Sequence, residues 1–75
     1  MPHIIVKMYP GRSLEQKQEF ALKITDEAVK ILGCSADSVS VAIEEIEQEN
    51  WKYQVYYPDI EEKKETLYKK PGYSF

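Results

Sequence analysis

Residues 13–33 read SLEQKQEFALKITDEAVKILG, and this stretch predicts a long helix, from about Leu14 to Leu32, with both ends marked. Ser13 is a good N-cap, and Gln16 three residues later completes a capping-box pattern. Gly33 is a typical C-terminal stop. Between the two ends, apolar side chains recur at helical spacing and predict a core-facing stripe, namely Phe20, Ile24, Ala28, Ile31 and Leu32.

A strand is predicted on each side of this helix. The side chains alternate with a period of two residues in two stretches, His3 to Tyr9 and Val39 to Ile46. Both stretches are rich in β-branched residues, as strands are. Pro10-Gly11 breaks the first strand before the helix begins. Strand, long helix and strand form a β-α-β unit, in which the two strands are parallel and the crossover is right-handed.

Two parallel strands and one helix do not make a stable sheet by themselves, so we expect further strands from another copy of the chain. The 75 residues allow one domain, 1–75, which buries only roughly 60% of its unfolded surface. Leu22 and Val29 lie one heptad apart on a second face of the helix, where a neighbouring subunit can make contact. The expected fold class is α/β, with the sheet completed by oligomerisation.

An additional helix is predicted in the C-terminal part. Gln48 to Trp51 is expected to be a turn or a short helical piece. Pro58 suits the first turn of a second helix, which would run to Lys70 and end at Pro71-Gly72. Acidic residues follow Pro58 and lysines precede Pro71, as the helix dipole favours. Residues 73–75 remain as an apolar tail.

The composition excludes several classes of function. The net charge of −3 and pI near 5.1 argue against binding of nucleic acid. No apolar stretch is long enough for a transmembrane helix, and no signal-peptide pattern is found, so we expect a cytoplasmic protein without a membrane partner. Cys34 is the only cysteine and His3 the only histidine, which excludes an internal disulfide and argues against a zinc site. We expect no cofactor.

Pro2 is a candidate base. If Met1 is removed, Pro2 carries a free secondary amine directly before an apolar strand. The pKa of an α-amino group is about 7.7–8.0, close enough to neutrality to be tuned for catalysis. The alternative is that Met-Pro is simply where the gene starts.

Arg12 and Trp51 are candidate binding residues, each the only one of its type. Arg12 lies just before the helix, where its guanidinium and the free N–H groups of the helix start together suit a carboxylate. The alternative is a solvated arginine that pairs with Glu15. Trp51 suits a pocket wall, and the alternative is packing in the core or in a dimer interface.

These features together resemble the 4-oxalocrotonate tautomerase family. The penultimate proline, the apolar strand, the stretch GRSLEQK at residues 11–17, the long helix and the Val-rich second strand match it without gaps from Pro2 to about Trp51. The longer C-terminal part, with Trp51 and KKPGYS at 69–74, is similar to the homodimeric branch of the family. The resemblance therefore implies a homodimer, with a hexamer as the alternative.

The resemblance also implies a mechanism. In the family, the N-terminal proline is a general base that moves a proton between the enol oxygen and a carbon of an enolpyruvate or 2-hydroxydienoate, and Pro2 would take this role. A dry pocket and a nearby Arg12 would lower the pKa of the amine towards neutrality. Arg12 matches the arginine that binds the substrate carboxylate, and Trp51 falls where the family has an aromatic wall.

Ser40 departs from the family pattern, because hexameric members carry a second arginine there. Its absence weakens an assignment to dicarboxylates and favours an aryl-substituted or short monocarboxylate such as phenylenolpyruvate. His3 and Ser40 would supply polar contacts to it. The competing hypotheses are a non-catalytic oligomeric binding protein on the same scaffold and, ranked lower, hydration or dehalogenation of unsaturated acids.

Overall fold

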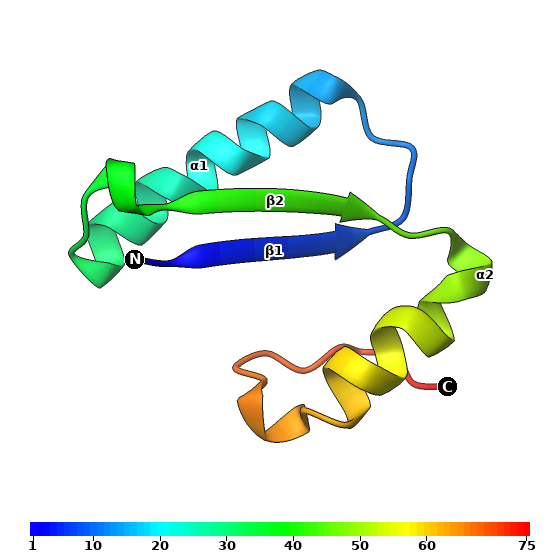
Figure 1. The fold of residues 1–75 in the computed structure, drawn as a ribbon. Helices are drawn as coiled ribbons and strands as arrows, with labels where there is room; N and C mark the ends of the chain where they lie inside the picture. Colours follow the sequence, from blue (N-terminus) through cyan, green and yellow to red (C-terminus); the bar gives the residue numbers. More distant parts are fainter. The chain divides into compact units, whose positions relative to one another are not determined.

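Strand β1 (His3–Met8), helix α1 (Leu14–Leu32) and strand β2 (Ser40–Glu45) form the first of two units, Met1–Glu45 and Ile46–Phe75. The computed structural model describes every residue from Met1 to Phe75. The two strands pair in parallel with His3 opposite Ser40 and Met8 opposite Glu45 (Figure 1). The predicted β-α-β unit is confirmed, with strands that are one or two residues shorter than expected.

Both ends of α1 are built as the sequence predicts. The Ser13 hydroxyl accepts a hydrogen bond from the Gln16 N–H at 3.1 Å, and the Gln16 side chain accepts one from the Ser13 N–H at 2.9 Å. Gly33 ends the helix at a φ of 70°, the left-handed region that favours glycine, and its N–H bonds the Val29 carbonyl at 3.2 Å. These bonds use backbone groups that a helix end otherwise leaves unpaired.

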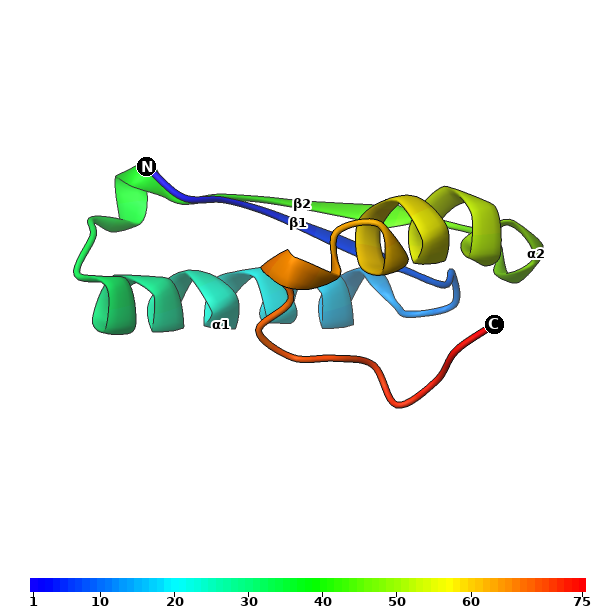
Figure 2. The same ribbon diagram turned by 90° about the horizontal axis from the view of Figure 1, so that it is seen from below.

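Helix α1 covers one face of the two-stranded sheet (Figure 2). Strand side chains that point to this face, such as Ile4 and Val6, are half-buried, and Ala28 of α1 is buried at 8% exposure. The predicted stripe is only partly covered, because Phe20 is 44% and Ile31 75% exposed. Within one chain, this unit has a very small core.

Strand β2 is preceded by the short 3₁₀ turn η1 (Ala36–Ser38). The second unit begins with helix α2 (Gln48–Trp51), which continues without a break into the π-helix η2 (Lys52–Glu61). A 3₁₀ turn, η3 (Lys64–Thr66), follows. Val55 and Tyr56, at 4% and 7% exposure, form the core of this unit.

The extra C-terminal helix is therefore confirmed, but its expected limits, Pro58 to Lys70, are wrong. Pro58 lies inside the helix, which begins ten residues earlier and ends before the lysines. Proline suits a first helical turn but does not require one. Inside an α-helix its ring would clash with the carbonyl four residues back, and the wider π-helical turn accommodates it. Val55 and Tyr56, the buried residues of this helix, both lie before the expected start.

No helix in the structure has both the length and the apolar character needed to cross a membrane.

Candidate active site

Pro2, His3 and Ser40 meet at the start of the two paired strands. The Ser40 N–H donates a hydrogen bond to the Pro2 carbonyl at 3.2 Å. His3 lies opposite Ser40 in the ladder, and its Nδ1 is 2.6 Å from the Ser40 hydroxyl, with the donor set by the imidazole tautomer. Three candidate residues thus occupy one edge of the sheet.

Pro2 itself is half-buried, whereas Met1 before it is fully exposed. In this chain the Pro2 nitrogen belongs to the peptide bond with Met1 and has no basic lone pair. The hydrogen bond from Ser40 to the Pro2 carbonyl fixes the residue on the strand edge, so removal of Met1 would leave the amine at a defined position.

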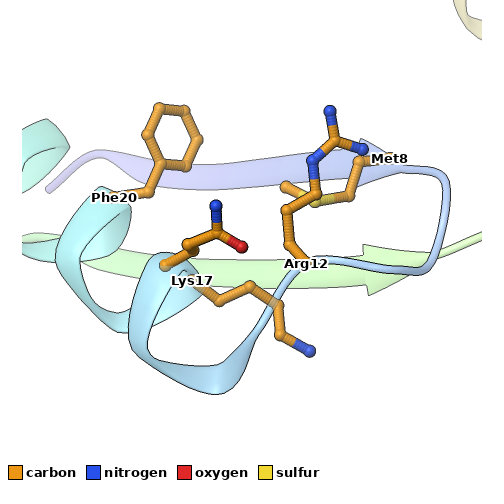
Figure 3. A pocket seen from close by; sticks show the side chains of 5 residues that line it. Met8, Arg12, Lys17 and Phe20 are labelled. Atoms are coloured by element: carbon orange, nitrogen blue, oxygen red, sulfur yellow. The ribbon is translucent and has the colours of Figure 1, made fainter.

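Arg12 lies at the opposite end of β1, in the connection to α1. It lines an open pocket of about 330 Å³ together with Met8, Gln16, Lys17 and Phe20. Figure 3 shows the Arg12 side chain beside Met8, with its guanidinium projecting to the same side as the Phe20 ring. A cation beside two apolar side chains suits a carboxylate that carries an apolar substituent.

Lys17 is the second cation of this pocket, but it is already engaged. Its ammonium group is 3.3 Å from the Glu45 carboxylate, which links the start of α1 to the end of β2. Figure 3 shows this ammonium pointing away from the Arg12 guanidinium. Arg12 is therefore the cation that remains for a ligand carboxylate.

Sequence reasoning missed Met8, Lys17 and Phe20 as lining residues. Phe20 was assigned to the core-facing stripe of the helix because its spacing fits the apolar periodicity. For Phe20, the signal that could have found it is spacing on the helix, because Gln16 and Phe20 lie four residues apart on one face of α1, directly after the loop that carries Arg12.

The two main candidates do not meet within one chain. Pro2 precedes β1 and Arg12 follows it, and a six-residue strand separates its ends by about 20 Å. That distance exceeds the length of a small monocarboxylate. If both residues act on one substrate molecule, they come from different copies of the chain.

Trp51 belongs to the second unit, where it ends helix α2. Its indole N–H donates a hydrogen bond to the Tyr73 hydroxyl at 3.0 Å. The structure contains no group of three or more His, Cys, Asp or Glu side chains placed to hold a metal ion.

The β-α-β fold, with a proline before its first strand and an arginine before its helix, defines a tautomerase-type protein, and comparisons with known proteins agree. A family model described as "Tautomerase enzyme" matches residues 2–58. A probable tautomerase of Xylella fastidiosa is 48% identical over 73 residues, which are 97% of this chain and 89% of that one. Tautomerase PptA of Pectobacterium atrosepticum is 47% identical over 76 residues, covering both chains completely.

Solved structures show the same fold. YwhB, a homologue of 4-oxalocrotonate tautomerase, matches with a TM-score of 0.60 and 37% identity over 61% of this chain and 75% of its own. TomN, a homologue from the tomaymycin biosynthetic pathway, matches with a TM-score of 0.65 and 32% identity over 67% of this chain and 77% of its own.

The chain belongs to the 4-oxalocrotonate tautomerase family and is a tautomerase, an isomerase. Within the family it is of the PptA type, since PptA relatives align with it from end to end. The family resemblance read from the sequence is confirmed.

Proposed function

We propose that this tautomerase interconverts the enol and keto forms of an enolpyruvate or 2-hydroxydienoate monocarboxylate, with the Pro2 amine as general acid and base. The observation that carries the proposal is the placement of Pro2, held on the sheet edge by the Ser40 N–H and next to the His3–Ser40 pair. Membership in the tautomerase family supports it.

The proposed reaction needs one base that returns its proton. After removal of Met1, the neutral Pro2 amine takes the proton from the enol hydroxyl, and the oxygen becomes the keto oxygen. The double bond shifts towards that oxygen, and the protonated amine delivers its proton to the carbon at the other end of the former enol. One proton leaves oxygen and one reaches carbon, so the enzyme is regenerated.

Arg12 of a neighbouring copy is proposed to hold the substrate carboxylate through paired hydrogen bonds. The separation of Pro2 and Arg12 along β1 supports this division between copies. The positive charge of Arg12 near the amine would lower the pKa of Pro2 and keep the base neutral at working pH.

We propose an aryl-substituted or short monocarboxylate, such as phenylenolpyruvate, as the substrate. Ser40 offers a hydroxyl where a second cation would be needed for a dicarboxylate. Apolar side chains next to Arg12, from Met8 and Phe20, suit an aryl group. The family resemblance assigns Trp51 to an aromatic wall that contacts the substrate. His3 and Ser40 are proposed as polar contacts to the enol part.

A homodimer is the proposed assembly, with a hexamer as the alternative. Only Ala28, Val55 and Tyr56 are buried in the single chain, and Leu22 and Ile31 of α1 are 68% and 75% exposed. So little burial does not sustain a stable isolated domain.

The test is ketonisation of phenylenolpyruvate by the wild-type chain and by Pro2→Ala, with the intact mass of both measured. Loss of the secondary amine is expected to lower kcat/KM by about 10²-fold or more, as for other general bases. Circular dichroism should show that the fold is retained. An unchanged rate would remove Pro2 from the mechanism, and a wild-type mass that includes Met1 together with no turnover would favour the non-catalytic binding protein.

A further inference from the structure

The C-terminal tail folds back onto the helix of its own unit. The ring of the buried Tyr56 contacts Tyr73 and Phe75 at centroid distances of 5.8 and 5.0 Å. Tyr73 and Phe75 also contact each other edge to face at 5.9 Å. Aromatic pairs at such distances are favourable beyond the area that they bury. The rings of Tyr56 and Phe75 therefore hold Tyr73 in place without using its hydroxyl.

That hydroxyl accepts the hydrogen bond of the Trp51 indole, at 3.0 Å and across 22 residues of sequence. The indole offers one N–H donor and no acceptor, so this bond orients the edge of the ring. We propose that Tyr73 is a positioning residue, whose hydroxyl holds Trp51 in the orientation that forms the aromatic wall for an aryl substrate. This inference rests on the proposed function, in which Trp51 contacts the substrate.

The hydrogen bond between Trp51 and Tyr73 joins a residue inside the segment that the family model matches to a residue outside it. The family model ends at residue 58, so it includes Trp51 but not Tyr73. A tail that orients a shared wall residue changes selectivity without altering Pro2 or Arg12. We therefore expect Tyr73 to affect the binding of the aryl group and not the proton transfer.

The deciding variant is Tyr73→Phe, which removes the hydroxyl and keeps the ring that contacts Tyr56 and Phe75. Its matched control is Tyr68→Phe, the same change at a fully exposed tyrosine. Two readouts are needed: kcat and KM with phenylenolpyruvate, and acrylamide quenching of the fluorescence of Trp51, the only tryptophan.

Loss of one neutral hydrogen bond is expected to raise the KM of Tyr73→Phe by about 2–10-fold, with kcat changed by less than about twofold. Quenching of Trp51 should become more efficient, because the ring is less restrained. Tyr68→Phe should match the wild type in both readouts. A short substrate without an aryl group, such as 2-hydroxypenta-2,4-dienoate, should show little change in KM.

Phe75→Leu tests the packing of the tail, since it weakens the ring contacts that hold Tyr73 and keeps the Tyr73 hydroxyl. Its rise in KM should not exceed that of Tyr73→Phe. A wild-type KM in Tyr73→Phe would overturn the proposal, whether or not the quenching changes, and a rise in Phe75→Leu alone would then assign the effect to packing of the tail. If the wild-type chain turns over no enol, the proposed function itself is wrong. The wild-type assay therefore tests the proposed function, whereas the variants test the role of Tyr73.

Discussion

At the residue scale, the contact between His3 and Ser40 leads to a specific prediction. Ser40→Ala removes the hydroxyl that lies 2.6 Å from the imidazole and leaves the ring without this partner. Because both residues are exposed, the fold should persist, while kcat/KM with phenylenolpyruvate falls by about 2–10-fold. Steady-state kinetics measure the effect.

Ser40→Thr is the matched control, because threonine keeps the hydroxyl and suits a strand. It should retain most of the wild-type kcat/KM. A loss in Ser40→Thr as large as that in Ser40→Ala, or no loss in either, would contradict a role for this hydroxyl.

The identities of the candidate residues at this edge could be read from the sequence, but their contact could not. His3 and Ser40 are 37 residues apart, and they meet only because the strands pair in the observed register. A slip by one residue would turn Ser40 to the other face of the sheet. Phe20 was not recognised as a pocket residue for a different reason. An apolar residue at helical spacing gives the same signal whether it lies in a core or in a pocket wall.

At the scale of elements, the N-cap of α1 gives a prediction for stability. Ser13→Ala removes the hydroxyl that accepts from the Gln16 N–H at 3.1 Å and breaks the capping box. Such losses cost about 1 kcal/mol, with a range of about 0.5–2 kcal/mol. Urea unfolding followed by circular dichroism should show this decrease in the free energy of unfolding.

Ser35→Ala is the matched control for the cap. Ser35 also stands at an N-cap, that of the 3₁₀ turn η1, but its side chain makes no capping hydrogen bond. Its free energy of unfolding should stay within about 0.5 kcal/mol of the wild type, as for most surface substitutions. Equal losses in the two variants would show that the capping bond of Ser13 is not the cause.

The elements differ in how well the sequence predicts them, and capping explains the difference. Helix α1 lies between residues that each satisfy free backbone groups, Ser13 with Gln16 at one end and Gly33 at the other, and its limits were predicted correctly. The C-terminal helix lacks a side-chain cap at its start, and Pro58 is a stronger local signal than Glu47. The buried residues of this helix, Val55 and Tyr56, lie before Pro58, and a local pattern does not reveal their burial.

At the scale of the whole molecule, the small core links folding to assembly. Three side chains are buried in the single chain, and each strand of the two-stranded sheet has one unpaired edge. In the proposed dimer, the second copy buries exposed apolar residues of α1 and brings an Arg12 to each Pro2. Stability and activity should therefore both depend on the concentration of the chain.

For a dimer that unfolds directly to separate chains, each tenfold dilution lowers the apparent free energy of unfolding by about 1.4 kcal/mol. With a urea m-value of about 1–3 kcal/mol per molar, the midpoint should fall by about 0.5–1.4 M for each tenfold dilution. Unfolding curves over a hundredfold range of concentration measure this shift, and sedimentation at the same concentrations gives the mass. Activity per chain should decrease as the mass decreases, because Pro2 and Arg12 lie at opposite ends of β1. A monomeric mass with a constant midpoint and full activity would show that one chain forms the complete site.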